Sequence, residues 1–359
     1  MDKLITFTVP CYNSAAYMDH CIETLLTAGE EAEIILVDDG SKKDNTPGKC
    51  DEWAEKYPTI IRAVHQENGG HGEGVNTGIR NAAGTYFKVV DSDDWLDTEA
   101  LKRVLDKLRA FADSPAPVDM LCANYVYEHA ADNTQKVMGY KNAFPVDRVF
   151  TWADTRPFLP QQCLLMHSVI YRTALLKEHH VPLPKHTFYV DNVYVYQILP
   201  YAKSLYYMDE DLYRYFIGRS DQSVNEAVMA RQVDHQLRTT RIMIKAHNVT
   251  AISAENPKLG RYMRNFMSMM MTVASIFSII AGTDEALAGR ASLWQELKAA
   301  DPKLYRYCRW SFTNVGTNLP GKEGRKLSVS LYHMAQKLYK FNECLWLSAF
   351  LSSATNWNL

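Results

Sequence analysis

The chain has 359 residues, of which 47% are apolar, so it can bury a sizeable core in one large domain or two. Its formal net charge of −2 and the lack of any block of lysine and arginine exclude a protein-wide positive field for nucleic acid. The seven cysteines are scattered without a C-x-x-C pair, and the start lacks the apolar stretch of a signal peptide, so we expect reduced thiols and a cytoplasmic protein, with the inner face of a membrane as an open option.

The first 110 residues alternate between strands and helices. Apolar runs of strand length lie at 4–9, where Pro10 ends the run, and at 33–37, 60–64 and 86–90. A helix follows each run: one carries Met18, Ile22, Leu25 and Leu26 behind a cap at Asn13 or Ser14, one begins at Asp44 or Thr46, one covers 74–83, and one is capped by Thr98. Four such pairs with short loops predict βαβ units and a doubly wound α/β fold, with a mostly parallel sheet and helices on both faces.

The pattern changes further along the chain. Strands are predicted at 120–127, 164–171, 204–208 and 211–217, with a short helix from Thr173 and another over about 192–202. From about residue 225 nearly everything has a helical pattern, over 225–247, 258–281, 284–300, 303–311 and 325–352. We therefore place a boundary near residue 225.

The helical region contains one window that invites a membrane interpretation. No charged residue lies between Arg264 and Asp284, about the length that a transmembrane helix needs. Small or polar residues nevertheless recur along one side, at Ser268, Thr272 and Ser275, which favours a buried core helix over contact with a membrane surface or a true span. The aromatic, apolar tail over 345–357 leaves three options open, namely packing on the helices, pairing with another subunit, or contact with a bilayer.

Three carboxylates follow the strand at 86–90 within four residues, at Asp91, Asp93 and Asp94. Such a cluster is costly unless water solvates it or it holds something positive. Ligands of doubly wound sheets bind just beyond the carboxyl ends of the strands. Aspartates at that edge can fasten a phosphate-bearing substrate through a hard divalent cation. The competing interpretation is a solvated turn that caps the next helix.

Five short motifs occur in order, each in a loop where the strand pattern predicts a ligand-facing edge. They are Pro10-Cys11-Tyr12-Asn13, Val37-Asp38-Asp39-Gly40-Ser41, Asn68-Gly69-Gly70, Asn76-Thr77-Gly78-Ile79 and Asp91-Ser92-Asp93-Asp94. Together they resemble the signature of glycosyltransferase family 2, whose members have the GT-A fold. The resemblance is strongest over residues 1–110, fair to about 224, and absent from the helical region. It implies a catalytic domain over 1–224 and an α-helical region over 225–359 that serves the acceptor, a partner or a membrane surface.

The resemblance implies contacts to a nucleotide-sugar donor. Tyr12 can present an aromatic face to a base, and Asp39 can accept hydrogen bonds from a base or ribose. Their competing roles are a packed loop tyrosine and a helix cap. The remaining donor-binding candidates from these motifs are Pro10, Asn13, Asn68, Gly70, Asn76 and Ser92. Many relatives carry an arginine just before the residue equivalent to Asn76, whereas this chain has Val75; Arg80 is the candidate substitute.

The same resemblance implies a metal site and a general base. In the D-x-D segment, Asp93 would coordinate Mn²⁺ or Mg²⁺, Asp91 would contact ribose, metal-bound water or the ion, and Asp94 would stabilise the following turn. An inverting transfer needs a general base for the acceptor hydroxyl. Asp191 matches that position, although Val190 replaces the usual glutamate, and its competing role is a helix cap. Arg219 or Ser223 matches the segment that closes over the donor.

The resemblance implies an inverting, metal-dependent transfer of a hexosyl or N-acetylhexosaminyl group, with UDP as the favoured carrier. The acceptor would be a saccharide or glycolipid hydroxyl in polysaccharide or glycoconjugate synthesis, with peripheral membrane contact and a homo-oligomer as open options. The alternative is a non-catalytic assembly subunit that keeps a nucleotide-sugar pocket, which Val75 and Val190 keep open. A nucleotidyltransferase ranks below both, because the loop after the first strand lacks a Gly-rich basic sequence. The histidines, His71 among them, show no metal-ligand spacing, so we expect structural roles for them.

Overall fold

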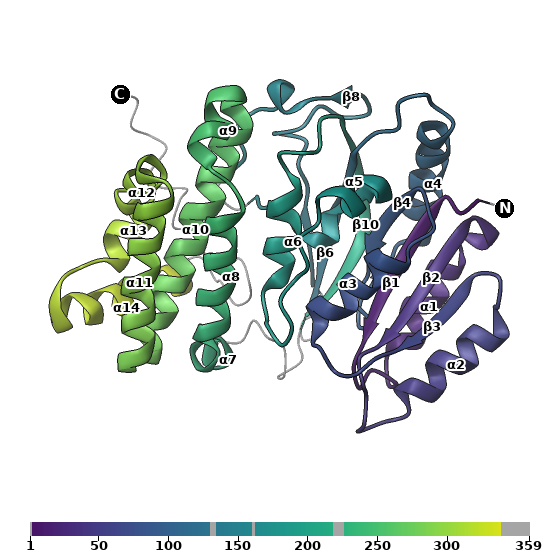
Figure 1. The fold of residues 1–359 in the computed structure, drawn as a ribbon, viewed down its shortest axis with the longest axis horizontal. Helices are drawn as coiled ribbons and strands as arrows, with labels where there is room; N and C mark the ends of the chain where they lie inside the picture. The colour runs from purple at the N-terminus through teal and green to yellow at the C-terminus, as the bar shows by residue number, and fades with distance from the viewer. Residues whose placement is uncertain (1, 130–133, 160–161, 218–225, 339–359) are drawn as a thin grey trace. The chain divides into compact units, whose positions relative to one another are not determined.

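A computed structural model describes residues 2–129, 134–159, 162–217 and 226–338. The chain divides into two compact units (Figure 1). The first, the α/β unit, contains Met1–Asp154 and Leu164–Gly218, and the second, the helical unit, contains Thr155–Cys163 and Arg219–Leu359. The short segment 155–163 thus leaves the α/β unit and packs with the helices, which no sequence pattern indicated.

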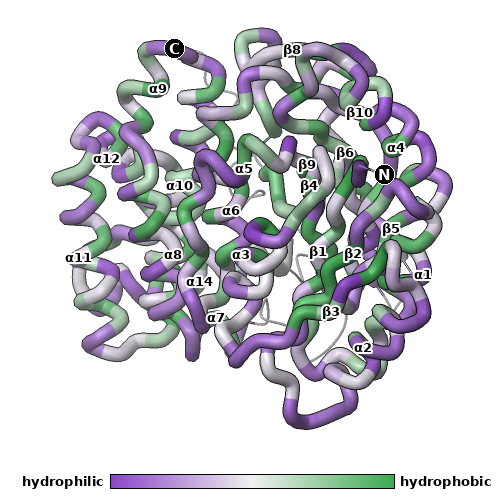
Figure 2. Tube along the Cα trace, turned by 45° about the vertical axis from the view of Figure 1, so that its right-hand side comes forward, coloured by the Kyte–Doolittle hydropathy of each residue, from purple (hydrophilic) through white to green (hydrophobic). Residues whose placement is uncertain are grey.

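The first half of the α/β unit is the parallel sheet that the sequence predicts. Its strands are β1 (Ile5–Cys11), β2 (Ala32–Asp38), β3 (Ile61–His65) and β4 (Tyr86–Val89), in the order β3-β2-β1-β4. β1 and β2 are buried and hydrophobic along most of their length (Figure 2), as strands covered on both faces must be. The prediction that Pro10 ends the first strand is wrong. Pairing of β1 with β4 stops at Thr8, so Pro10 continues the strand with only β2 beside it.

The second half of the sheet is mixed. β9 (Val169–Arg172) lies antiparallel between β4 and β6 (Met120–His129), and β10 (Leu205–Ile217) runs parallel to β6. Short antiparallel strands complete the sheet: β5 (Trp95–Leu96), β7 (Thr134–Met138) and β8 (Val149–Phe150). The two strands predicted at 204–208 and 211–217 are one strand. The pairing of β10 with β6 shifts register between Tyr207 and Tyr213. This bulge interrupts the alternation of residues along the strand, so the sequence pattern predicts two strands.

Helices cover both faces of this sheet. α3 (His71–Asn81), α5 (Thr173–His179) and α6 (Val190–Ile198) lie on one face, and α1 (Met18–Leu26) and α4 (Thr98–Ala112) lie on the other (Figure 1). α2 (Thr46–Lys56) packs beside β2 and β3.

Two predicted helix caps are wrong. Neither Asn13 nor Ser14 caps α1 with its side chain, and the carboxylate of Asp97, not Thr98, caps α4 by accepting from the Ala100 N–H at 3.0 Å. Helix α3 also begins three residues earlier than the predicted start at residue 74, so His71 belongs to its first turn.

From Glu226 onward, the described part of the helical unit consists of α-helices and the short turns that join them. Its helices are α7 (Glu226–Arg231), α8 (Val233–Ala246), α9 (Val249–Glu255), α10 (Pro257–Ala281), α11 (Asp284–Ala300), α12 (Pro302–Arg309), α13 (Phe312–Thr317) and α14 (Gly321–Leu338). The single helix predicted over 225–247 is two helices, α7 and α8, and the prediction missed α9 and α13. The end of the predicted helix 325–352, and the aromatic tail, lie outside the described residues.

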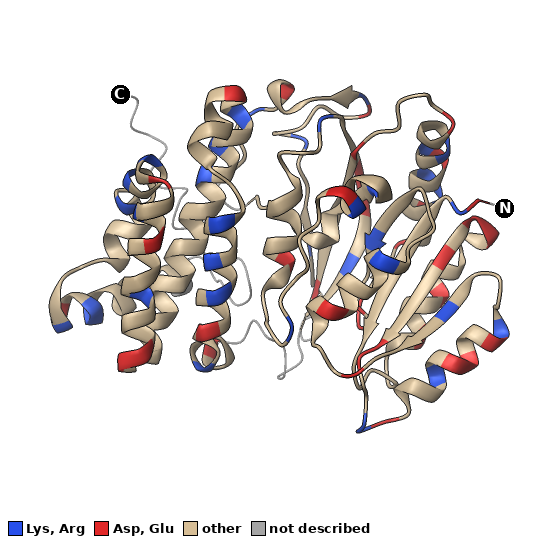
Figure 3. Cartoon of the chain, in the orientation of Figure 1, with Lys and Arg blue, Asp and Glu red and all other residues tan. Residues whose placement is uncertain are grey.

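Among the described helices, α10 alone is long and apolar enough to cross a bilayer, and 78% of its most apolar window is buried. Its polar stripe forms hydrogen bonds with neighbouring helices of the same unit. Ser268 donates to Ser311, Thr272 pairs with Thr313, and Ser275 accepts from the Trp294 indole. These contacts are those of a core helix. Positive and negative side chains are interspersed over both units (Figure 3), which agrees with the small net charge.

Asp119 provides a test of the α/β unit's stability. Its buried carboxylate accepts from Arg172 at 2.7 Å and from the Lys203 and Ser204 N–H groups. Burial alone would raise the pKa of Asp119, but these donors hold it below its usual value. This contribution is therefore present above the unfolded pKa of about 4 and is lost as the pH falls through the folded pKa.

We expect Asp119→Asn to lower the free energy of unfolding at pH 7 by about 2–4 kcal/mol, and to have a smaller effect at low pH. Urea denaturation measures both quantities. Asp106→Asn is the matched control, because Asp106 is exposed and pairs with Arg109 on the surface, where the cost stays below about 1 kcal/mol. Equal effects of the two substitutions at pH 7 would contradict the assignment.

Candidate active site

The predicted site residues gather at one edge of the sheet. The parallel strands β1, β2, β3 and β4 all end there, so the loops that follow them become neighbours although up to 80 residues separate them in sequence. Asn13 shows how two of these loops are joined. Its backbone, at φ 51°, donates to Ser41, and its side-chain oxygen accepts from the Lys42 and Lys43 N–H groups. Tyr12, beside it, is 51% exposed and free to present its ring.

Asp39 organises the glycine-rich loop after β3. Its carboxylate is 3% exposed and accepts four hydrogen bonds, from the Gln66 and Asn68 amides and from the Gly69 and Gly70 N–H groups, all between 2.7 and 3.0 Å. Gly70 adopts φ 81°, and a Cβ there would lie 3.0 Å from the His186 nitrogen, so the loop needs glycine at this position. Asp39 therefore shapes the loop, and a direct contact to a base stays a prediction.

Asn76 lies in α3 and is 2% exposed. Its amide donates to Glu73 and to the Leu183 carbonyl, and its oxygen accepts from the Leu183 N–H and contacts the His180 ring at 2.9 Å. Asn76 thus ties α3 to the segment before α6. The arginine proposed as a substitute at this position, Arg80, pairs with Glu73.

Asp91 and His71 form an ion pair at the end of β4. The His71 Nε2 lies 2.8 Å from the Asp91 carboxylate, and both side chains are partly exposed. Burial disfavours the charged form of each, yet the attraction between them prevails: the pKa of His71 is raised and that of Asp91 is lowered. The negative charges of Asp191 and Asp93 also raise the pKa of His71, so three carboxylates act on this imidazole.

Asp94 is a structural member of the acidic segment. It is 1% exposed, and its two oxygens accept from the Tyr213 hydroxyl at 2.6 Å and from the Phe216 N–H at 2.9 Å. Burial and the neighbouring carboxylates raise its pKa well above the usual value. Its own N–H donates to the Asp91 carbonyl. Asp94 thus forms the turn and fastens it to β10, which agrees with the turn-stabilising role expected for it.

Asp191 lies in the first turn of α6. The cap residue of this helix is Tyr189, at φ 64°, so the interpretation of Asp191 as a helix cap is wrong. Its carboxylate is partly buried and accepts from Asn192 at 3.2 Å. Burial raises the pKa of Asp191, and the positive His71 works against that rise. A carboxylate with a raised pKa that interacts electrostatically with Asp91 and His71 has the chemistry that a general base needs, and this role of Asp191 stays a prediction.

One group of side chains could hold a cation. Ligand atoms of Asp91, Asp94 and His167 lie within 4.8 Å of one another. His167 is 5% exposed, and its Nδ1 has no hydrogen-bond partner among the described residues. Two carboxylates and an imidazole nitrogen are a donor set that suits a divalent first-row metal. The residues present therefore fit a cation at this site. Asp93, half-buried on the same segment, is outside this group, and its assignment to the metal stays a prediction.

Comparisons with known proteins agree with the geometry. The family model described as glycosyl transferase family 2 matches residues 6–167. The chain carries a glycosyl transferase family 2 domain.

Two relatives come from Bacillus subtilis (strain 168). The uncharacterized glycosyltransferase EpsJ is 39% identical over 111 residues, and the putative glycosyltransferase EpsH is 25% identical over 316 residues. The match covers 30% of this chain and 31% of EpsJ, and 83% of both this chain and EpsH. The chain thus spans less than a third of EpsJ.

Among solved structures, S. aureus TarS 1–349 has a TM-score of 0.64 at 18% identity, and the match covers 92% of both chains. At this identity the likeness shows a shared fold, with the GT-A type of α/β sheet followed by helices. The fold class predicted from the sequence is therefore confirmed.

Sequence reasoning missed two residues of this family 2 domain. His167 lies within a predicted strand, and no motif in the sequence connects it with the aspartates. Lys88 was read as part of an apolar strand, yet a lysine inside such a run is itself a signal. It is fully buried, donates to the His167 carbonyl at 2.7 Å, and burial lowers its pKa to about 7. Arg219 and Ser223 lie outside the described residues.

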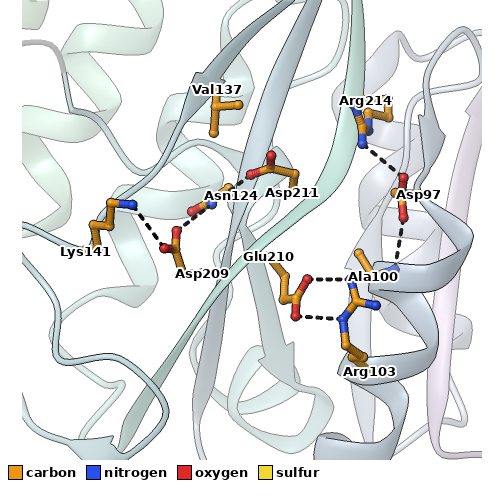
Figure 4. Close-up of a pocket in the computed structure, with 10 residues that line it drawn as sticks. All are labelled: Asp97, Ala100, Arg103, Asn124, Val137, Lys141, Asp209, Glu210, Asp211 and Arg214. Atoms are coloured by element: carbon orange, nitrogen blue, oxygen red, sulfur yellow. Dashed lines mark hydrogen bonds and ion pairs between the residues drawn. The ribbon is translucent and has the colours of Figure 1, made fainter.

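A cavity of about 520 Å³ lies elsewhere on the α/β unit, between α4 and the middle of β6 and β10 (Figure 4). Six of its charged residues form ion pairs, Arg103 with Glu210, Lys141 with Asp209, and Arg214 with Asp97, and Asp211 accepts a hydrogen bond from Asn124. None of the described site residues of the family 2 domain lines it. This cavity is therefore separate from the active-site edge.

Asp39→Asn tests the loop. A carboxamide offers one acceptor oxygen and turns an NH₂ group toward N–H donors, so we expect a loss of stability of about 2–4 kcal/mol. Hydrogen exchange at the Gly69 and Gly70 amides should be faster in the Asp39→Asn variant than in the wild type. Asp51→Asn is the control, because Asp51 is exposed and pairs with His65, outside the glycine-rich turn. Unchanged exchange at both glycines would show that Asp39 does not hold the loop.

Proposed function

We propose that the protein is a nucleotide-sugar glycosyltransferase that moves a hexosyl or N-acetylhexosaminyl group to an acceptor hydroxyl with inversion. The observation that carries this proposal is the ion pair of His71 with Asp91 of the D-x-D segment, because the charge of Asp191, about 100 residues further along the chain, acts on the same imidazole. A donor-binding acidic pair beside a base of raised pKa is what a displacement at a sugar carbon requires. Family membership and the fold support the same assignment.

The chain's own residues would divide the work. Asp191 would take the proton of the acceptor hydroxyl as its oxygen attacks the anomeric carbon from the face opposite the leaving group. The bond from that carbon to the diphosphate would break, and a nucleoside diphosphate would leave. A single displacement of this kind inverts the configuration. Tyr12 and the loop shaped by Asp39 would hold the nucleotide.

The D-x-D segment would hold a divalent cation, Mn²⁺ or Mg²⁺, through Asp93 and Asp91. When bound, such an ion neutralises the charge that develops on the diphosphate. His71, which is paired with Asp91, would keep that carboxylate ionised and oriented.

We propose UDP as the carrier. TarS 1–349 has also been solved in complex with UDP-GlcNAc, at a TM-score of 0.50 and 19% identity. The acceptor is proposed to be a saccharide or glycolipid of polysaccharide or glycoconjugate synthesis. We assign catalysis to residues 1–224 and propose that 225–359 serves the acceptor, a partner or the inner face of the membrane, in a cytoplasmic protein.

A thermal-shift screen of nucleotide diphosphate sugars, with and without Mn²⁺, tests the donor. The right donor should raise the melting temperature through binding to the native state alone, by RT ln(1 + [L]/Kd) in free energy. Asp93→Ala should remove the metal-dependent part of this rise, and Asp106→Ala, on the exposed face of α4, should leave it intact. A screen in which no nucleotide sugar shifts the wild type would refute the proposal.

Asp191→Asn tests the base. We expect transfer to fall by about 10²–10⁴-fold while donor binding stays within a few-fold, because general-base catalysis contributes this much to the rate. Since the pKa of Asp191 is raised, the wild-type kcat should increase with pH through that pKa and then level off, as the base becomes ionised. Product analysis by chromatography at several pH values measures both. Intact binding with no transfer by the wild type to any acceptor would favour the non-catalytic assembly subunit.

A further inference from the structure

We propose that His167 is a nitrogen ligand of the divalent cation at the acidic segment, and that it makes this site prefer first-row transition ions such as Mn²⁺ over Mg²⁺. The inference rests on the proposed function for the presence of a cation. It adds a residue that lies outside the D-x-D segment, 76 positions after Asp91 and in a part of the chain with no metal-binding pattern.

Geometry provides the first argument. A ring nitrogen of His167 lies within 4.8 Å of carboxylate oxygens of Asp91 and Asp94. Atoms at such separations can share one ion, since metal–ligand bonds are about 2.0–2.2 Å long. The three residues come from different parts of the sheet: the aspartates follow β4, and His167 lies in the short turn of helix just before β9.

Unsatisfied polarity provides the second argument. His167 is 5% exposed, and its buried Nδ1 has no hydrogen-bond partner among the described residues. Leaving such a group unpaired costs about 1–3 kcal/mol, which a folded protein rarely tolerates without a use. His180, a partly buried histidine of the α/β unit, shows the contrast, because it contacts Asn76 with one ring nitrogen and Gln197 with the other.

Fixed orientation provides the third argument. The imidazole packs against the rings of Tyr213 and Tyr215, with ring centroids 4.6 and 4.5 Å away. Lys88 holds the backbone of the same residue by donating to its carbonyl. A ligand held in place before the ion arrives needs no reorganisation on binding, which is how supporting residues tune metal sites. Lys88 is thus a positioning residue for His167.

The nature of the donor decides the selectivity. Mg²⁺ favours oxygen ligands in an octahedral shell, whereas imidazole nitrogen binds first-row transition ions more strongly. An acidic segment alone would serve either ion. One imidazole added to it shifts the preference toward Mn²⁺ and Co²⁺.

Pulsed electron paramagnetic resonance of Mn²⁺ bound to the full-length protein with saturating UDP tests the proposal directly. A coordinated imidazole produces a nitrogen coupling in that spectrum, which we expect in the wild type and not in His167→Phe. This variant keeps the ring packing but has no ligand atom. Titration calorimetry should show its Mn²⁺ affinity reduced at least about tenfold, with a smaller loss for Mg²⁺.

Two further variants sharpen the result. His167→Asn offers an oxygen in place of the nitrogen, so it should lose the nitrogen coupling and bind Mg²⁺ better than His167→Phe does. His179→Phe is the matched control, because His179 stacks on Tyr201 at the end of α5 and should keep both the coupling and the Mn²⁺ affinity.

The outcomes separate the two proposals. A wild type that binds UDP with Mn²⁺ but lacks a nitrogen coupling, or a His167→Phe variant that keeps the coupling and the Mn²⁺ affinity, overturns the role of His167 alone. A wild type that binds no nucleoside diphosphate with any cation overturns the proposed function and this inference with it. Melting curves of all variants show whether each is folded.

Discussion

The negative charge concentrated at the end of β4 is the constraint on which the rest of the α/β unit depends, because neighbouring elements must provide partners for these carboxylates. Asp91, Asp93 and Asp94 lie within four residues and are at least half-buried, where like charges repel strongly. The structure treats them differently. Asp91 is kept ionised by His71, and Asp94 is held by Tyr213 and the Phe216 N–H with its pKa raised. One segment thus contains an ionised carboxylate, Asp91, and a structural anchor, Asp94.

This constraint reaches across the sheet. His71 is positioned by α3, whose start depends on the loop that Asp39 shapes through four hydrogen bonds. Tyr213 belongs to β10, and the buried Lys88 ties β4 to the turn that carries His167. The ligand-facing groups are therefore supported by buried polar contacts, each of which would be costly to leave half-made. Such a network gives rigid geometry at the edge where the proposed transfer takes place.

Much of this could be predicted from the sequence. Parallel strands covered on both faces form continuous apolar runs in the sequence, so β1, β2 and β4 and the motifs that follow them are predictable from the sequence. The predictions that were wrong concern features that a single local contact decides. Pro10 stays in a strand because only β2 pairs with that strand at this position. Asp97 rather than Thr98 caps α4. A bulge in β10 interrupts its pattern, so the sequence predicts two strands where the structure has one. Propensity does not separate these alternatives.

The sequence by itself determined the fold class, the order of the loops at the sheet's edge, and the identity of the acidic segment, because periodicity and short motifs are local properties. Only the tertiary structure decided what each polar side chain does. Asp39 shapes a loop, Asn76 joins two segments, and His167 meets Asp91 across 76 residues of chain. These contacts depend on which strands become neighbours in the mixed sheet. The spacing of the residues along the chain does not show which strands those will be.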